Sequence, residues 1–285
     1  MATQQIIDMR NRPTFLHPFY GKNGQGPEVE VVRWLGKRVG ARDIDHFLAH
    51  SDVNAYLSAL DAAGITHAVI TGRSTPAVRI PNDDVRAVVQ KVPTRFIGIG
   101  AIDPLALGVS GSVDEVRRIK DMGLQGVNMD PAFLTEPLQA DDARLFPVYE
   151  ECQRLSLPVF LMTGPTSPDL RYAHPANIGA VAKAFPRLKL VVSHGGYPFV
   201  DEMIGVAFKH ENVLVSPDFY IFVAGSHTFV EAANGFMRYQ LLFGTGYPFR
   251  PMKQTVDDFL RLGFQDEILP DVLYNNAARL LGLAN

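Results

Sequence analysis

The chain has 285 residues, of which 47% are hydrophobic and 20% are charged, and this composition is typical of a globular protein and excludes a disordered or fibrous one. Its net charge of −3 provides no basic excess for phosphate groups, so we expect no nucleic-acid partner. The single cysteine excludes a disulfide within the chain and a cysteine-based metal centre, and the lack of a targeting segment or of about 18 consecutive apolar residues predicts a cytoplasmic protein without a membrane partner.

Short apolar segments recur along the chain and predict buried strands. They are rich in Val, Ile, Leu and Phe and do not alternate with polar residues, which is typical of strands that are covered on both faces of a parallel sheet. In chain order these segments are residues 5–10, 66–71, 95–102, 124–129, 158–163, 188–193, 212–216 and 240–244.

Amphipathic stretches separate these segments and predict helices. They are residues 51–63, 112–122, 141–155, 175–185, 199–210, 226–236, 255–262 and 266–281. The alternation of strand and helix, with no break in composition, predicts an α/β fold in which residues 1–285 form a single (β/α)8 TIM barrel. A doubly wound sheet is the alternative, but the first strand is not followed by G-x-G-x-x-G and the chain contains no G-x-x-x-x-G-K-[ST].

One long insertion, from about residue 13 to residue 50, follows the first predicted strand. It contains aromatic residues and glycines, among them Phe19, Tyr20, Gly21 and Trp34. In a barrel this position lies on the catalytic face, where long loops often act as lids. The other interpretation is a structural excursion that packs on the side of the barrel.

Polar residues follow the predicted strands, where a barrel carries its chemistry. Arg10 and Arg12 are two residues apart on the first strand, so their side chains point the same way. Two arginines in a barrel mouth require an anion, because a buried unpaired charge is costly. Either aspartates of the chain or a carboxylate or phosphate of a ligand could supply it, and the sequence leaves both interpretations open.

A histidine and an aspartate at two later strand ends are candidates for acid–base chemistry. His194 closes an apolar segment directly before two glycines, a setting that favours a proton-transfer role over a structural one. Asp218 follows the next strand and is expected to orient His194 or to activate water. Further strand-end residues are expected to contact a substrate, and they are Arg73, Asp130, Thr163, Tyr220 and Tyr247.

Several sequence segments are similar to those of a known family. They are I-D-M-R-N-R at 7–12, R-F-I-G at 95–98, F-P-R-L-K-L-V-V-S-H-G-G at 185–196, L-F-G-T-G-Y-P-F at 242–249 and N-A-A-R-L-L at 276–281. In combination they resemble the amidohydrolase-related proteins (amidohydrolase 2), the branch that includes small decarboxylases, hydratases and lactonases. This resemblance implies a TIM barrel with its site at the carboxyl ends of the strands.

The resemblance also implies a divalent metal in many members, held by two strand-one histidines, a strand-five histidine and a strand-eight aspartate. In this chain the corresponding residues are Arg10, Arg12, Met162 and Gly246, and only the strand-six histidine, His194, is kept. Arginine stays protonated and offers no lone pair to a metal. We therefore expect no cofactor, since His194 with Asp218 would supply only two ligands, enough for weak or adventitious metal binding.

These observations predict a metal-independent hydrolase or lyase, of the lactonase, hydratase or decarboxylase type, that acts on a small carboxylated substrate. Arg10 and Arg12 would bind the anion, and His194 would move protons with the help of Asp218. The alternative is a non-catalytic barrel that binds an anionic metabolite. The expected partner is a small anionic molecule, and the sequence is compatible with a homo-oligomer.

Overall fold

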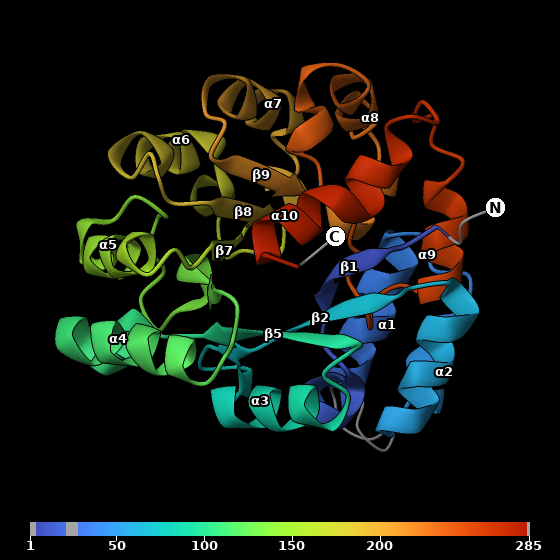
Figure 1. Cartoon of the computed structure of the whole chain (residues 1–285), viewed down its shortest axis with the longest axis horizontal. Helices are drawn as coiled ribbons and strands as arrows, with labels where there is room; N and C mark the ends of the chain where they lie inside the picture. The colour runs from blue at the N-terminus through green and yellow to red at the C-terminus, as the bar shows by residue number, and fades with distance from the viewer. Residues whose placement is uncertain (1–3, 21–27, 284–285) are drawn as a thin grey trace.

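Seven parallel strands form one curved sheet in the computed structural model, which describes residues 4–20 and 28–283. Each strand pairs in parallel with the next one in the sheet order β1-β2-β5-β6-β7-β8-β9. Figure 1 shows this sheet curling around a common centre. The strands are β1 (Ile7–Asn11), β2 (His67–Thr71), β5 (Phe96–Ala101), β6 (Val127–Met129), β7 (Val159–Met162), β8 (Leu190–Ser193) and β9 (Val213–Ser216).

The eighth position of the barrel is filled by residues 240–247, which run beside both β9 and β1 without forming a regular strand. The amide of Leu242 donates to the carbonyl of Val215 at 2.9 Å, and the amide of Met9 donates to the carbonyl of Phe243 at 3.0 Å. The predicted TIM barrel is therefore confirmed as a nearly closed one. The predicted strand at 240–244 is replaced by this bridged segment, which contains Gly244 and, two residues later, Gly246.

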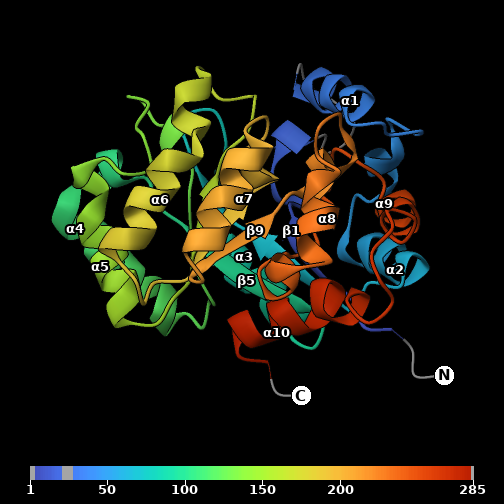
Figure 2. The same cartoon turned by 90° about the horizontal axis from the view of Figure 1, so that it is seen from above.

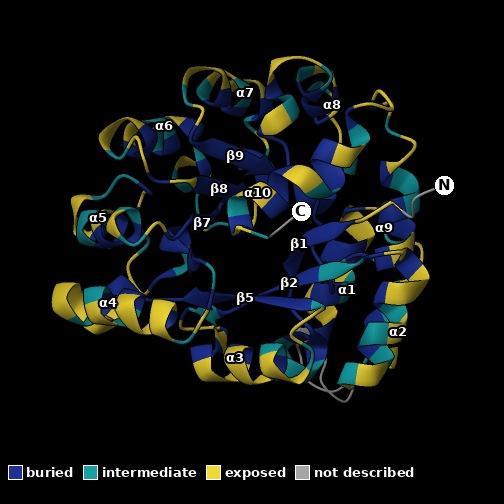
Figure 3. Ribbon diagram, viewed as in Figure 1, coloured by how far each residue is buried: buried dark blue, intermediate teal, exposed yellow. Residues whose placement is uncertain are grey.

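Helices surround the sheet, with their exposed faces outward and their buried faces on the strands (Figures 1 and 3). They are α1 (Glu28–Arg38), α2 (Val53–Ala63), α3 (Asn82–Lys91), α4 (Pro104–Asp121), α5 (Phe146–Arg154), α6 (Pro175–Ala184), α7 (Val200–Lys209), α8 (Thr228–Ala233), α9 (Met252–Phe259) and α10 (Asn276–Leu281). A short antiparallel hairpin, β3 (Arg73–Ser74) with β4 (Arg79–Ile80), follows β2. Within the described part of the chain, no helix is both long and apolar enough to cross a membrane.

The barrel interior is filled by side chains of alternate strand residues. Ile7 and Met9 of β1 meet the inward residues of the other strands, including Phe160 and Val191. Residues of α10 join the same apolar cluster, so this helix closes one end of the barrel. Figure 2 shows α10 and α1 at opposite ends of the molecule. The residues that follow the carboxyl ends of the strands therefore lie at the α1 end, away from α10.

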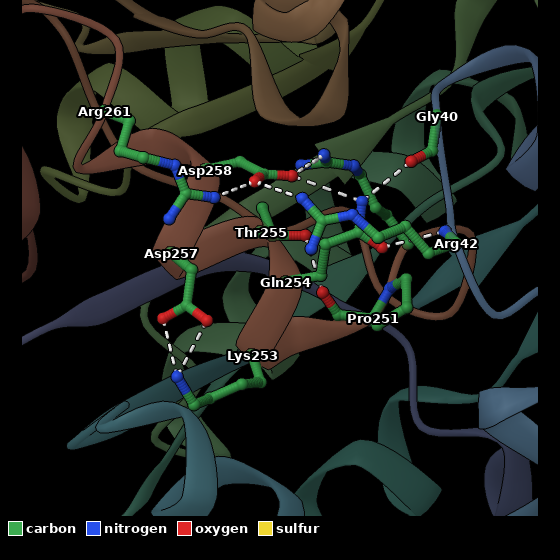
Figure 4. Close-up of polar contacts among 10 residues, drawn as sticks. Gly40, Arg42, Pro251, Lys253, Gln254, Thr255, Asp257, Asp258 and Arg261 are labelled. Carbon is green, nitrogen blue, oxygen red and sulfur yellow. Dashed lines mark hydrogen bonds and ion pairs between the residues drawn. The ribbon is translucent and has the colours of Figure 1, made fainter.

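The insertion predicted at 13–50 contains α1 and short 3-10 turns at Thr14–Leu16, Pro18–Tyr20 and His46–Ala49. Gly21, together with the rest of residues 21–27, lies outside the described residues. The described part after α1 is fixed to α9, as Figure 4 shows. Gln254 donates to the carbonyl of Gly40 at 2.7 Å, and Arg42 donates to Asp258 at 2.7 Å.

Candidate active site

Residues from several strand ends meet at a cavity of about 360 Å³ at the carboxyl end of the barrel. Arg12 reaches it from β1, Arg73 from the hairpin after β2, Met162 from the end of β7 and His194 from the turn after β8. Arg12 and His194, which meet at this cavity, lie 182 positions apart in the chain. The carboxyl-end location is the one that carries chemistry in TIM barrels.

Arg10 and Arg12 are buried, and most of their donors have no partner within the described residues. Nη1 of Arg10 donates to Oδ1 of Asn128 and to Oγ of Ser193, both at 3.2 Å. Nε and Nη2 of Arg10 and Nε and Nη2 of Arg12 are buried without a hydrogen-bond partner. Unsatisfied buried donors are costly, so this corner of the site is built to receive acceptor atoms.

Asp8 does not neutralise the guanidinium of Arg10, although it lies two residues away. Its oxygens accept hydrogen bonds from the amide and hydroxyl of Thr245, at 2.8 and 2.5 Å, and from the backbone amide of Arg10 at 3.2 Å. Burial, together with the positive charge of Arg12, lowers the pKa of Arg10 to about 9. Arg10 is therefore still charged at neutral pH and keeps donors without a partner, although it is not among the residues that line the cavity.

Arg73 is the third arginine of the site, and it has an internal anion. Its Nε lies 3.0 Å from Oδ2 of Asp130, and its guanidinium lies over the ring of Phe133 at 5.3 Å. Burial alone would raise the pKa of the Asp130 carboxyl, but Arg73, followed by Arg12 and Arg10, lowers it. Arg10, Arg12 and Arg73 are named here the arginine cluster, and Asp130 belongs to its wall rather than standing free for a substrate.

His194 and Asp218 form a pair behind this cavity. Oδ2 of Asp218 accepts a hydrogen bond from the backbone amide of His194 at 3.1 Å and lies 3.0 Å from Nδ1 of its ring. Ser216 donates to the other oxygen of Asp218 at 2.6 Å. Burial lowers the pKa of His194, an effect that Asp218 opposes and Arg10 and Arg12 reinforce. The ring is therefore neutral at pH 7. Its Nδ1 lies beside the Asp218 carboxylate without a well-aligned hydrogen bond, and a proton on Nδ1 would leave Nε2 as the proton acceptor.

The backbone at both members of this pair is in the left-handed region, with φ of 67° at His194 and 53° at Asp218. Residues other than glycine rarely adopt it, and such conformations cluster at functional sites because the surrounding structure must enforce them. Gly244 provides part of the space, since a Cβ at that position would overlap Oδ1 of Asp218. The conformational energy of this left-handed backbone is an independent indication that the positions of the His194 and Asp218 side chains are functionally important.

The remaining predicted residues divide into cavity-lining and supporting ones. Tyr220 lines the cavity, and its ring centre lies 5.3 Å from that of His194. Thr163 donates to the carbonyl of Ser193 and accepts from the amide of Gly196, so it fixes the turn that carries His194. The hydroxyl of Tyr247 lies 3.0 Å from Nδ1 of His50. Neither Thr163 nor Tyr247 is among the described lining residues, so their predicted substrate contact is not supported by these positions.

Sequence reasoning missed the apolar wall of the cavity. Phe19, Trp34 and Leu35 come from the insertion, and they line the cavity together with the aromatic residues Phe133, Phe219 and Phe249. Trp34 is 49% exposed, which places the opening of the cavity beside α1. The density of aromatic residues after the first strand was the available signal, but a sequence alone does not show where a long insertion packs.

The residues present do not fit the divalent metal that the resemblance implies. Two of the corresponding positions carry guanidinium groups, and Met162 offers only a weak thioether ligand. The fourth position, Gly246, has φ of +65°, and a Cβ there would overlap the ring of Phe219. Among the described residues, no three His, Cys, Asp or Glu side chains are grouped so as to hold a metal ion.

Comparison with known proteins agrees with this architecture. Residues 48–283 match the Amidohydrolase family, Amidohydro_2. A 2-amino-3-carboxymuconate-6-semialdehyde decarboxylase of Dictyostelium discoideum is 30% identical over 239 residues, which are 71% of this chain and 65% of that protein. The chain thus spans a little under two thirds of the length of this curated relative.

Two solved structures resemble the chain over nearly its whole length. An uncharacterised TIM-barrel protein of Bordetella bronchiseptica, Bb4693, is 32% identical with a TM-score of 0.89, and the match covers 98% of each chain. A 5-carboxyvanillate decarboxylase of Novosphingobium aromaticivorans, solved with manganese and 4-hydroxy-3-methoxy-5-nitrobenzoic acid, is 15% identical with a TM-score of 0.68, and the match covers 98% of this chain and 96% of that one. The family match over residues 48–283 identifies the chain as a member of the Amidohydrolase family.

Proposed function

We propose that this chain is a metal-independent lyase or hydrolase that acts on a small carboxylated molecule. The observation that carries the proposal is the set of partnerless, buried guanidinium nitrogens of Arg10 and Arg12 beside the His194–Asp218 pair. This arrangement combines a binding site for an anion with a group that can transfer a proton, and such a reaction requires both.

The arginine cluster would bind the carboxylate of the substrate. Among the described residues, the three guanidiniums have one directly paired carboxylate, Asp130, so an incoming anion gains both electrostatic attraction and hydrogen bonds. Guanidinium donors match the two oxygens of a carboxylate, and such charge-assisted hydrogen bonds are about twice as strong as neutral ones. The aromatic wall suits a planar, mainly apolar body, as in the aromatic ligand of the 5-carboxyvanillate decarboxylase.

His194 would act as the general base through Nε2. In a hydrolysis it takes a proton from water, the oxygen of that water attacks the substrate carbonyl, and arginine donors stabilise the oxyanion that forms. The carbonyl then re-forms, the bond to the leaving group breaks, and the leaving group takes the proton from His194. In a decarboxylation the bond to the carboxylate breaks, CO2 leaves, and the electron pair stays on the substrate carbon. That carbon then takes a proton, which His194 can deliver once it has itself been protonated.

Likeness to decarboxylases supports the lyase branch of this proposal, while the neutral His194 suits the hydrolase branch equally well. The metal-independent part rests on the side chains at the four corresponding positions, since the two guanidinium groups have no lone pair for a cation, glycine has no side-chain ligand, and Met162 offers only a weak thioether. The manganese was found in the Novosphingobium protein, and we do not assign it to this chain.

A thermal-shift screen with small carboxylates tests the proposal. The panel contains benzoate, 2,6-dihydroxybenzoate, 5-carboxyvanillate and 2-pyrone-4,6-dicarboxylate, each with and without chelator. A ligand at 100 times its Kd stabilises by about 2.7 kcal/mol, and we expect at least one member to do so equally with and without chelator. The exchange Arg12→Met should reduce this effect to about half or less, because a tenfold weaker site at the same ligand concentration gives about 1.4 kcal/mol. The exposed Arg171, paired with Asp169, provides the control variant Arg171→Met.

Turnover of the stabilising acids is then followed by ultraviolet absorbance. A lyase or hydrolase consumes at least one of them after chelation. Binding without turnover of any acid would instead favour the non-catalytic barrel. Stabilisation by no acid, or activity that disappears with the removal of a stoichiometric metal, would overturn the proposal.

A further inference from the structure

Asn128 of β6 is a buried amide to which the proposed function gives no role. Its side chain lies within hydrogen-bond distance of both a cation and an anion. Oδ1 accepts from Nη1 of Arg10 at 3.2 Å, and Nδ2 donates to Oδ1 of Asp130, also at 3.2 Å. The other oxygen of Asp130 lies 3.0 Å from Nε of Arg73. The four side chains therefore form one continuous chain that begins and ends at an arginine.

The amide of Asn128 can take only one orientation in this chain. A guanidinium only donates hydrogen bonds and an ionised carboxylate only accepts them, so Oδ1 faces Arg10 and Nδ2 faces Asp130. A neutral group thus separates a buried cation from a buried anion that could otherwise pair directly. Asp130 comes two residues after Asn128, a spacing at which the side chains of an extended segment point the same way.

This separation decides which arginine has a carboxylate partner. The carboxylate lies beside Arg73, whereas Nε and Nη2 of both Arg10 and Arg12 are without a hydrogen-bond partner among the described residues. Arg12 lines the cavity, and Nη1 of Arg10 donates to Oγ of Ser193 at 3.2 Å, directly before His194. The uncompensated positive charge therefore lies on β1, beside the turn that carries the histidine.

We propose that Asn128 is a positioning residue of the anion site, which reserves the carboxylate of Asp130 for Arg73 and so directs the carboxylate of a substrate to Arg12. The inference rests on the proposed function, because it concerns the same site. It explains how a site with three arginines and one internal carboxylate presents a defined place for a second carboxylate, near the group that moves the proton.

The double exchange Asn128→Asp/Asp130→Asn tests this inference. It moves the internal carboxylate by two residues and changes neither the net charge nor the number of polar groups. Each contact in the chain keeps a donor and an acceptor, because the new carboxylate can accept from Arg10 and from the new amide, whose oxygen faces Arg73. The guanidinium without a carboxylate is then that of Arg73, which also lines the cavity.

The measured quantity is the factor by which Arg12→Met weakens binding of benzoate, or of the acid found in the carboxylate screen. We expect a factor of roughly ten in the wild-type protein. In the exchanged protein we expect less than about threefold, because Arg73 then holds the acid and Arg12 no longer couples to it. The same or a larger factor in the exchanged protein overturns the inference while the proposed function stands, since an asparagine that only packs would leave the factor unchanged.

The chain offers a matched control at the α10 end of the molecule. Asn275 donates to Asp271 at 2.9 Å, and the other oxygen of Asp271 lies 2.5 Å from Nε of Arg238, which repeats the order of amide, carboxylate and guanidinium. None of these three residues lines the cavity. The exchange Asn275→Asp/Asp271→Asn should therefore leave the factor for Arg12→Met at its wild-type value.

NMR signals of arginine Nε–H groups provide a readout that requires no ligand and only one conservative exchange. Arg10→Lys and Arg73→Lys assign the two signals by their loss. We expect Asp130→Asn to shift the signal of Arg73 and to leave that of Arg10 in place. Equal shifts would show that Asn128 does not separate the two groups, and they overturn the inference even where the doubly exchanged protein does not fold. If the wild-type protein binds no acid, the proposed function fails, and this comparison alone decides the role of Asn128.

Discussion

One carboxylate oxygen of Asp218 serves both the backbone and the ring of His194, at 3.1 Å from its amide nitrogen and 3.0 Å from Nδ1. The contact fixes the left-handed backbone of the histidine and the orientation of its ring at once. A change at Asp218 therefore acts on the position of His194 as well as on its proton.

Replacing Asp218 by asparagine should lower kcat by roughly a hundredfold, within the range of about 10²–10⁴ that positioned acid–base catalysis contributes. The amide can no longer select the tautomer with a free Nε2. Steady-state kinetics on the acid found in the carboxylate screen measures the effect, with Asp169→Asn, an exposed ion-pair partner, as the control. Activity within twofold of the wild type would show that the pair is structural.

The pH profile of kcat/KM should have its acidic limb below pH 6.5. Burial lowers the pKa of His194 from 6.5, so the base form is present at neutral pH and is lost only at lower pH. Asp218→Asn removes the anion that opposes this shift and should move the limb lower still. A limb that lies above pH 6.5 in the wild type would contradict the assignment of His194 as a neutral base.

Exchange of Arg12 for methionine should weaken carboxylate binding by about tenfold or more, since a charge-assisted contact contributes about 1.5–3 kcal/mol. The melting temperature should stay the same or rise, because Nε and Nη2 of Arg12 have no partner in the described structure. Arg12→Lys should restore binding only in part, as a point charge lacks the bidentate fork. A variant that melts far lower yet binds equally well would show Arg12 to be structural.

Restoring the aspartate of the metal-dependent pattern, by Gly246→Asp, should destabilise the protein rather than create a metal site. A Cβ at Gly246 would overlap the ring of Phe219, and overpacking of this kind costs about 1–3 kcal/mol. Gly64→Asp is the matched control, because Gly64 also has positive φ but no atom lies within 4 Å of an added Cβ. Urea unfolding of the two variants, with and without manganese, measures the difference. Equal stability, or a gain with manganese, would refute the expectation.

The contribution of Asp8 to stability should fall as the pH rises from 4 to 7. Burial raises the pKa of Asp8 from 3.8 to about 6, although hydrogen bonds from Thr245 oppose the shift. The folded state thus holds this proton more tightly, and a contribution of roughly 3 kcal/mol is present below pH 4 and lost as the pH passes about 6. Asp8→Asn cannot ionise and should remove this contribution, so between pH 4 and 7 the stability of the variant should fall less, or rise more, than that of the wild type, as chemical unfolding at several pH values would show. A curve identical to that of the wild type would contradict the assignment.

The barrel could be predicted from sequence because buried parallel strands are continuous apolar runs, as at Leu190–Ser193. Two features resisted this reasoning. Helix α3 was missed because its apolar stripe is short, with Val85 and Val88 among charged residues. The eighth segment was expected as a strand, but its pairing to β1 and β9 is reduced to single bridges around Gly244 and Gly246.

Much of the candidate site was also accessible from sequence, since strand-end polar residues converge whatever the loops do. Arg12, Arg73, His194 and Tyr220 meet at one cavity as the barrel topology requires. Tyr20 and Trp34 could not be placed, because their positions depend on the tertiary packing of the insertion. The state of each charge, such as the unpaired Arg10 beside a carboxylate that binds elsewhere, follows from hydrogen bonds that no sequence pattern encodes.

Because the insertion is anchored to α9, helix α1 and the barrel strands contribute two different sets of side chains to the cavity. In the proposed function, side chains on the barrel strands and their turns would bind the charged group of a substrate. Val31, Trp34 and Leu35 line the cavity from one helix, α1, and would contact the rest of the substrate. Asp258 accepts from Arg42, Arg250 and Arg261 and keeps the end of that helix in register. New preferences for the body of a substrate can therefore arise by changes on α1 alone, while the arginines and the proton-transfer pair remain untouched.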